Sequence, residues 1–221
     1  MILQQKIEEA RGLILEQLAL EEPACVTASF QTECMVLVHM LHRERPSIPV
    51  LFLDTGYHFT ETIAYRDRMA AAWNLNLINL RPAETVAEQE SRLGILYGSA
   101  PDKCCGLRKV GPLFAALEKY GVWFTGLRRE QSPTRANLQA EDMFRLPSGK
   151  HLRKISPLAL WTNQEIWSYL KSYEIPVLPL YDQGYTSIGC QPCTSRPISP
   201  DDLRSGRWGG HKLECGIHLE S

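Results

Sequence analysis

The sequence lacks an excess of charge of either sign, and it lacks an apolar run long enough to cross a bilayer. Its 221 residues carry a formal net charge of −1, so nothing in the overall charge favours nucleic acid or an anionic membrane as a partner. The first 22 residues lack the basic start, apolar block and cleavage site of a signal peptide. They have the spacing of an amphipathic helix, and we expect a cytoplasmic protein.

Seven cysteines are present, and in a reducing compartment they predict metal or thiol chemistry rather than a disulfide framework. Two close pairs stand far apart in the chain: Cys104 with Cys105, and Cys190 with Cys193. Adjacent side chains diverge, which suits a single zinc ion poorly, whereas a [4Fe–4S] cubane offers a different iron to each thiolate. We therefore favour one [4Fe–4S] cluster, with a zinc site or unligated thiols as the alternatives.

Strand-like and helix-like stretches alternate through the first half of the chain. Apolar, β-rich runs predict strands at 24–30, 49–54, 75–80 and 122–126. Helical spacing predicts helices at 34–44, 60–73 and 107–120, the second with Thr60 as its N-cap. This alternation is typical of βαβ units. It predicts a Rossmann-like α/β fold with an open, mostly parallel sheet.

The second half has a different pattern. Residues 127–154 are polar and basic, and we expect a loop there. The stretch TNQEIWSYLKSY predicts a helix that opens with a capping box from Thr162 to Glu165. From residue 192 onward no packed element is evident. We therefore expect an α/β domain at 1–191 and a flexible C-terminal segment at 192–221.

Three motifs follow three of the expected strands: SFQTEC (29–34), LDTGYHF (53–59) and TGLRREQSPTR (125–135). In an open α/β sheet, ligands bind beyond the carboxyl ends of the strands. Backbone N–H groups and hydroxyls in such turns bind anions, and arginine binds phosphate or sulfate with two hydrogen bonds. Each motif alone is also typical of an ordinary turn. Together they predict an anion site formed by Ser29, Gln31, Thr32, Asp54, Thr55, Arg128, Arg129 and Arg135.

The C-terminal stretch LRSGRWGGHKLECGIH places a cysteine, Cys215, close to the end of the sequence. Arg204 and Arg207 are cationic, and two glycines after Trp208 form a hinge. The pattern predicts a lid that brings Cys215 to an anion at the sheet edge. A reactive cysteine is a thiolate, which nearby positive charge favours, and we expect that charge from His211, Lys212 and His218. The alternative is a disordered tail with an incidental cysteine.

Taken in order, SFQTE, LDTG, the CC and CxxC pairs, TGLRREQS and the terminal ECGIH resemble the assimilatory adenylyl-sulfate reductases of the sulfonucleotide reductase family. The resemblance runs from about Cys25 to His218. It implies a fold like that of the PP-loop adenine-nucleotide hydrolases. It also implies reduction of adenosine 5′-phosphosulfate (APS) to sulfite and AMP in sulfate assimilation and cysteine biosynthesis. Reduced thioredoxin or a similar dithiol protein would be the electron donor. A homo-oligomer is a further expectation.

The same resemblance implies roles for individual residues. Cys215 attacks the sulfate sulfur and becomes an S-sulfocysteine, from which a thioredoxin thiol releases sulfite. Lys109 lies near both cluster and substrate. The implied cluster ligands are Cys104, Cys105, Cys190 and Cys193. The implied substrate-binding residues are Ser29, Phe30, Gln31, Thr32, Leu53, Thr55, Gly126, Arg128, Arg204 and Arg207. We also expect His218 to bind the substrate.

The sequence departs from the family pattern at Cys34, where many relatives have an acid, and at Pro101, where some have histidine. The alternative is reduction of the 3′-phosphorylated nucleotide PAPS, or of both nucleotides. Members specific for PAPS usually lack the cluster cysteines, but some members with a cluster accept both. A PP-loop sulfurtransferase or ligase would need an SGGxDS-type loop, which SFQTEC is not. A non-enzymatic, zinc-stabilised nucleotide-binding module is the remaining alternative.

Overall fold

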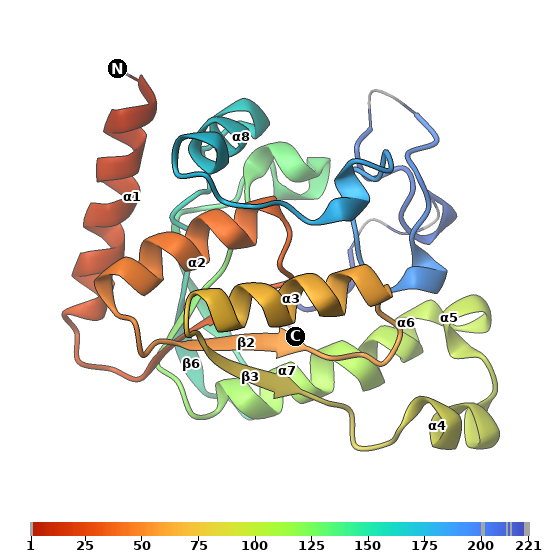
Figure 1. Cartoon of the computed structure of the whole chain (residues 1–221). Coiled ribbons are helices and arrows are strands. Elements are labelled where there is room, and N and C mark those ends of the chain that lie inside the picture. Colours follow the sequence, from red (N-terminus) through yellow and green to blue (C-terminus); the bar gives the residue numbers. More distant parts are fainter. Residues whose placement is uncertain (1, 200–201, 211, 213, 219–221) are drawn as a thin grey trace.

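A six-stranded sheet forms the centre of the protein (Figure 1). The structure is a computed structural model that describes residues 2–199, 202–210, 212 and 214–218. The strand order is β3-β2-β1-β4-β6-β5, and all neighbours are parallel except β5 and β6. The predicted α/β fold with a mostly parallel sheet is confirmed. The strands are β1 (Ala24–Thr27), β2 (Pro49–Leu53), β3 (Asn76–Leu80), β4 (Val122–Phe124), β5 (Glu141–Arg145) and β6 (His151–Ile155).

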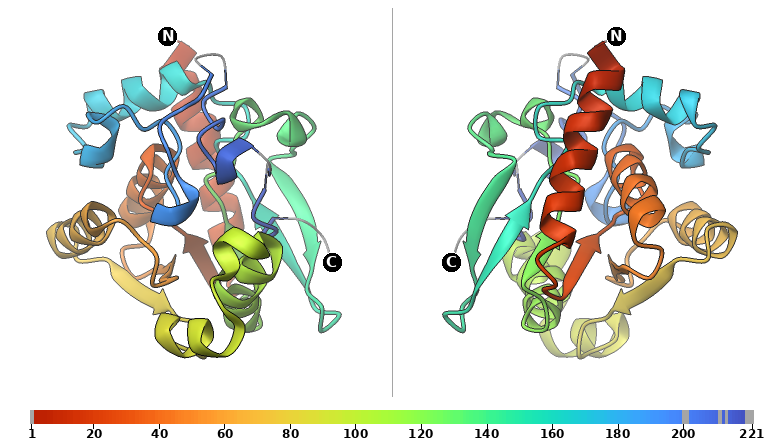
Figure 2. Two further views of the ribbon diagram at one scale, coloured as in Figure 1. Left: turned by 90° about the vertical axis from the view of Figure 1, so that its right-hand side faces the viewer. Right: turned by 90° about the vertical axis from the view of Figure 1, so that its left-hand side faces the viewer.

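Helices connect the strands and cover both faces of the sheet (Figure 2). The α-helices are α1 (Ile2–Leu18), α2 (Thr32–Glu44), α3 (Thr60–Ala72), α4 (Val86–Leu93), α5 (Leu96–Ser99), α6 (Pro101–Cys105), α7 (Gly111–Leu117) and α8 (Asn163–Ser172). A π-helical turn, η1 (Gly106–Val110), joins α6 to α7. Short 3-10 turns are η2 (Arg129–Gln131), η3 (Pro133–Arg135), η4 (Pro179–Tyr181), η5 (Gln191–Cys193) and η6 (Trp208–Gly210).

The alternation of side chains along each strand divides the core into two apolar clusters. Val26 and Phe52 belong to a cluster that includes buried residues of α1, α2, α3 and α8. Cys25, Leu51 and Trp123 point to the other face and pack with α7. Strands that are buried on both faces carry nearly continuous apolar runs, which is why the sequence showed them clearly. None of the helices in the described ranges is long and apolar enough to cross a bilayer.

The polar stretch 127–154 contains the antiparallel pair β5 and β6, so the expectation of a loop was wrong. Phe144 and Leu152 face the α7 cluster, but Glu141 and Met143 are exposed. The pair lies at the edge of the sheet. Its strands are short and largely charged, and this composition concealed their alternation.

Helix boundaries also differ from expectation, and two of the differences bear on the predicted residues. The helix expected from residue 107 already begins at Pro101, where proline's missing N–H costs no helical hydrogen bond. Cys104 and Cys105 therefore lie on a helix rather than in a loop. Thr60 is the first residue of α3 and not its N-cap, which is Phe59 without a side-chain hydrogen bond. The capping box that opens α8 is confirmed.

The C-terminal segment packs beyond the carboxyl ends of the strands, on the side to which the arrows of β2 and β3 point (Figure 1). Isolated β-bridges join Thr194 to Arg207 and Ser199 to Asp202. Ile217 packs against the α7 cluster. The expectation that residues from 192 onward form no packed element is therefore wrong for the part of this segment that the structure describes. The division into domains at 1–191 and 192–221 stays a prediction.

Candidate active site

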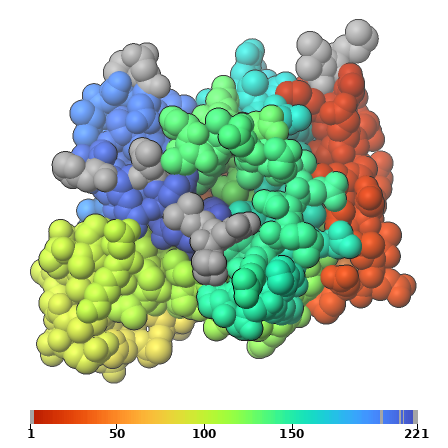
Figure 3. Space-filling view, turned by 180° about the vertical axis from the view of Figure 1, so that it is seen from behind, coloured from red at the N-terminus to blue at the C-terminus, as the bar shows by residue number. Residues whose placement is uncertain are grey.

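A cavity of about 1190 Å³ lies at the carboxyl end of the sheet. It is lined by the turn after β1, the end of β2, the segment after β4, and the C-terminal segment. Figure 3 shows the face on which the C-terminal segment (blue) meets the segment after β4 (green). The cavity brings together most of the predicted site residues, which come from distant parts of the chain: Ser29, Gln31, Thr32, Leu53, Lys109, Gly126, Arg128, Arg204, Arg207, Cys215 and His218.

Asp54, predicted for the anion site, does not line this cavity and instead accepts a bond from Arg81 at 3.2 Å. Two predicted substrate-binding residues do not line it either. Phe30 is fully buried, and its ring packs edge-on against Phe52 at 5.8 Å between ring centroids. The backbone φ of Phe30 is 58°, in the left-handed region. The Phe30 side chain points into the core, whereas its neighbours Ser29 and Gln31 line the cavity. Thr55 is also fully buried, and its hydroxyl lies 3.3 Å from the Cys190 sulfur. Any contact of these two residues with substrate would have to be indirect.

The turn after β1 is held in shape by its own polar groups. The Ser29 backbone N–H donates to the Cys34 sulfur at 3.4 Å, and the Gln31 amide donates to the Ser29 hydroxyl at 3.0 Å. The Gln31 side-chain oxygen accepts a bond from the Ile188 backbone at 2.7 Å. Gly126 passes so close that a Cβ there would lie 3.3 Å from the Cys34 nitrogen. Cys34 thus has a structural place in the turn.

Arg128 is 3% exposed and is already paired. It donates to Glu33 at 2.8 Å, to Glu130 at 2.9 Å and to the Trp161 carbonyl at 3.0 Å. Burial alone would raise the pKa of the Glu33 carboxyl, but the charge and hydrogen bond of Arg128 outweigh it and hold that pKa below its usual range. Arg128 therefore ties the segment after β4 to α2, in addition to lining the cavity.

Replacing Arg128 by methionine is expected to lower the free energy of unfolding by about 3–5 kcal/mol, because it leaves the Glu33 carboxylate buried without its partner. Urea unfolding monitored by tryptophan fluorescence measures the change. The matched control is Arg92→Met, which removes an exposed arginine from a two-hydrogen-bond pair with Glu84 and should change stability little. Equal effects of the two substitutions would contradict the assignment.

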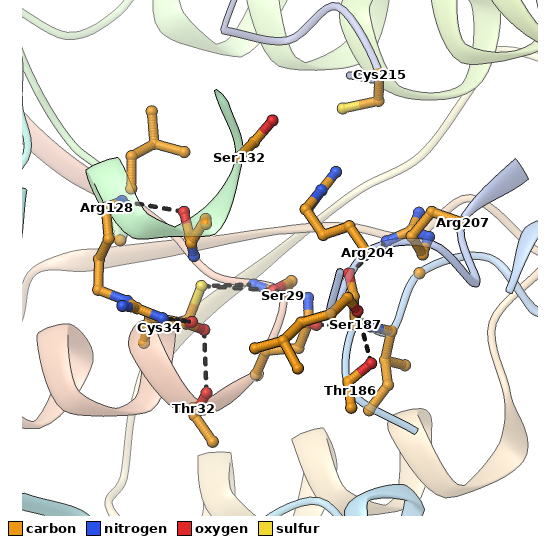
Figure 4. Close-up of a pocket in the computed structure, with 18 of the residues that line it drawn as sticks. Ser29, Thr32, Cys34, Arg128, Ser132, Thr186, Ser187, Arg204, Arg207 and Cys215 are labelled. Carbon is orange, nitrogen blue, oxygen red and sulfur yellow. Dashed lines mark hydrogen bonds and ion pairs between the residues drawn. The ribbon is translucent and has the colours of Figure 1, made fainter. Parts of the chain in front are cut away.

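The other side of the cavity carries a group of cations near Cys215, a residue of intermediate exposure (Figure 4). Burial and the like charges of Arg135 and Arg207 lower the pKa of Arg204 to about 10, so it stays charged at neutral pH. Burial alone would lower the pKa of Lys109, but the thiolates of Cys190 and Cys215 outweigh it and raise that pKa. The Arg207 guanidinium lies over the Trp208 ring at 4.4 Å from its centroid. Anionic groups are favoured here.

His218 does not supply positive charge to Cys215, contrary to the prediction. Its burial, together with the nearby charges of Lys154, Arg135 and Arg204, holds its pKa well below the ordinary value, and the ring is neutral. The ring stacks on Trp123 at 5.4 Å. Lys212 pairs with Asp102. The third expected source of charge, His211, lies outside the described residues.

The four predicted cluster cysteines line one small second cavity. Cys104 and Cys105 reach it from α6, and Cys190 and Cys193 reach it from the turn at η5. Within the described ranges, no three His, Cys, Asp or Glu side chains converge as the ligands of a single metal ion would. The thiolates of a cubane instead surround their cluster, each on a different iron. Four thiol side chains around one cavity match the ligand set of a [4Fe–4S] cluster in number and type.

Lys109 and Trp208 line both cavities, so the cysteine cavity and the larger cavity adjoin. Arg108, which was not predicted as a site residue, also lines the cysteine cavity and is 3% exposed. It donates to the Thr55 carbonyl at 2.6 Å and to the Gln89 side chain at 3.0 Å. Its place between the cysteine pair and Lys109 in KCCGLRK was the available signal.

The phosphoadenosine phosphosulfate reductase domain matches residues 23–196, most of the chain. The sequence is 48% identical over 186 residues to a protein of Mycolicibacterium smegmatis named adenosine 5′-phosphosulfate reductase, covering 83% of this chain and 78% of that relative. A protein of the same name from Rhodococcus opacus is 47% identical over 188 residues, covering 83% and 74%. The chain belongs to the phosphoadenosine phosphosulfate reductase family, and the predicted family resemblance is confirmed.

The fold is also similar to that of a solved family member. The crystal structure of phosphoadenylyl-sulfate (PAPS) reductase from Candida auris, a phosphate complex, superposes with a TM-score of 0.71 at 27% identity. The match covers 84% of this chain and 90% of that one. FMN adenylyltransferase from Candida glabrata gives a TM-score of 0.63 at 16% identity over 99% of this chain and 76% of that one, a likeness of fold alone. These neighbours confirm the predicted PP-loop type of fold.

Proposed function

We propose that the protein reduces APS to sulfite and AMP through an S-sulfocysteine on Cys215. The observation that carries the proposal is the position of Cys215 at a cavity that also holds Lys109, Arg204 and Arg207. The relatives named adenosine 5′-phosphosulfate reductase support the choice of substrate. The cavity, at about 1190 Å³, has room for a mononucleotide.

In the first step, the Cys215 thiolate attacks the sulfur of the sulfate group. A sulfur–sulfur bond forms and the bond from that sulfur to the phosphate oxygen breaks, so AMP leaves with the electron pair. Negative charge grows on the departing phosphate. Lys109, Arg204 and Arg207 line the cavity beside Cys215 and would stabilise that charge. The turn from Ser29 to Thr32 offers polar groups to the nucleotide on the facing side of the cavity.

In the second step, a thiolate of reduced thioredoxin or a similar dithiol protein attacks Cys215 and releases sulfite. The mixed disulfide is then resolved by the second thiol of the donor, which regenerates the Cys215 thiol. The donor is oxidised by two electrons, and sulfate sulfur is reduced to sulfite by the same two. Cys215 must reach two partners in turn, which accounts for its place on a C-terminal segment.

Cys104, Cys105, Cys190 and Cys193 would hold one [4Fe–4S] cluster in the cavity that they share. If bound, that group and its four thiolates would set the electrostatic field around Lys109, which lines the same cavity. The two thiols of the donor account for both electrons, so the residues of this chain need only bind substrate, hold charge and position Cys215. Such thiol chemistry requires a reducing compartment, and we propose the cytoplasm. A homo-oligomer stays a prediction.

The test is an anaerobic assay of protein that retains iron and sulfide, mixed with APS and reduced thioredoxin. Sulfite and AMP are expected in equal amounts, and no sulfite should form without a dithiol donor. The second candidate substrate is PAPS, favoured by the similarity to the Candida auris PAPS reductase. The ratio of kcat/KM for the two nucleotides decides between them: we expect the larger value for APS. A larger value for PAPS would correct the substrate but keep the chemistry.

A further inference from the structure

The residue before Cys215 is tied to the segment after β4 by an ion pair that is mostly shielded from solvent. Arg135 donates to the Glu214 carboxylate twice, from Nε to Oε1 at 2.8 Å and from Nη2 to Oε2 at 2.7 Å. The Thr134 hydroxyl adds a third bond to Oε1 at 2.9 Å. The two side chains of the ion pair are each only 11% exposed. Two parallel hydrogen bonds to a carboxylate fix distance and orientation together.

The surroundings keep this pair charged. Burial alone would raise the pKa of Glu214, but the hydrogen bond and charge of Arg135, with the charge of Arg204, outweigh it and lower that pKa. On the other side of Cys215, Ile217 packs on the α7 cluster and the His218 carbonyl accepts a bond from Lys154 at 3.1 Å. Cys215 therefore lies between two docked contacts, one ionic and one mainly apolar.

We propose that Glu214 is a positioning residue for Cys215, and that its pair with Arg135 is the latch that holds the C-terminal segment over the cavity. The proposal rests on the proposed function only for its effect on catalysis; the latch itself is a property of the fold. It assigns Arg135 a role other than the phosphate binding that its sequence motif suggests. In this closed arrangement, Nε and Nη2 of Arg135 donate to Glu214, and Nη1 donates to the Gln131 side chain.

The latch is tested by the rate at which iodoacetamide alkylates Cys215, measured anaerobically on cluster-containing protein by peptide mass mapping, without nucleotide. Glu214→Gln keeps the size of the side chain but removes its charge. We expect alkylation at Cys215 to become about tenfold faster or more, because loss of one partner of a buried ion pair leaves the other charge unpaired. The matched control, Glu84→Gln, removes the carboxylate of the exposed two-hydrogen-bond pair with Arg92 and should leave the rate unchanged.

A double-mutant cycle shows whether the two residues act as one unit. Arg135→Gln should accelerate alkylation as much as Glu214→Gln, and the double variant should be no faster than either. Accelerations that multiply in the double variant, or a Glu214→Gln rate equal to that of the wild type, would overturn the proposal.

A second readout separates this proposal from the proposed function. In a single turnover with APS and no dithiol, Glu214→Gln should form the Cys215 adduct about tenfold more slowly, whereas release of sulfite by thioredoxin from preformed adduct should not slow, since opening is easier. If wild-type protein forms no adduct but the alkylation cycle behaves as expected, the proposed function fails and the latch stands. If the adduct forms at the same rate in both proteins, the positioning role is overturned and the proposed function stands.

Discussion

Replacing Cys215 by serine is expected to lower sulfite formation by more than about a thousandfold, because a serine hydroxyl at neutral pH offers no thiolate to attack sulfur. The nucleotide should still bind, since the turn after β1 and the cations at Lys109, Arg204 and Arg207 remain in place. Sulfite release and equilibrium binding of AMP measure the two properties separately. Iron and sulfide content should also be unchanged, because Cys215 is not among the four cysteines of the second cavity.

Cys34 provides the matched control, since it is a second cysteine of intermediate exposure that lines the same cavity. Burial raises the pKa of its thiol, although hydrogen bonds from Ser29 oppose the shift. Cys34→Ser should therefore still form sulfite. Turnover near that of the wild type in Cys215→Ser would remove Cys215 as the nucleophile, and an equal loss in both variants would point to general damage to the cavity.

Cys193→Ser is expected to lose iron, sulfide and sulfite formation together. Cys193 comes from the turn at η5, whereas Cys104 and Cys105 come from α6, so removing it takes away a ligand that links two distant segments. Four thiolates are needed to hold all four irons of a [4Fe–4S] cluster. Iron and acid-labile sulfide analysis, with the visible absorption spectrum, measures the outcome without reference to activity.

Cys25→Ala is the control for that substitution. Cys25 is fully buried in β1, belongs to the same apolar cluster as Leu51 and Trp123, and does not line the cysteine cavity. Burial raises the pKa of its thiol, which marks it as an inert core residue. This variant should keep its iron and sulfide. Unchanged iron in Cys193→Ser would show that the ligand assignment is wrong.

The sequence predicted the central sheet well because β1, β2 and β4 are buried on both faces and read as apolar runs. It missed the edge strand β5 and its neighbour β6 because each has an exposed side with charged residues, and that composition resembles a loop. It placed the turn motifs correctly at the cavity because the carboxyl ends of parallel strands meet at one edge. Phe30 and Thr55 are exceptions because both are fully buried. Nothing in SFQTEC indicates the left-handed backbone of Phe30.

Interactions between distant residues were beyond the sequence. The pair of Arg135 with Glu214 joins positions 79 residues apart, and each side chain alone is typical of a solvated surface. His218 is neutral because it is buried and lies near the cations Lys154, Arg135 and Arg204. The sequence shows only a histidine close to Cys215, and this pattern led to the wrong prediction of a positive charge. The sequence did not predict a site role for Arg108, because that role depends on the π-helical turn, from which Arg108 donates to the Thr55 carbonyl.

Covalent reduction at Cys215 is tested by the intact mass of the protein after brief anaerobic mixing with APS, with no dithiol present. We expect a gain of one SO₃ group, located at Cys215 by peptide mapping and removed when reduced thioredoxin is added. PAPS in a parallel reaction should give the same adduct more slowly or not at all. No adduct with either nucleotide, on protein shown to retain iron and sulfide, would contradict covalent reduction at Cys215.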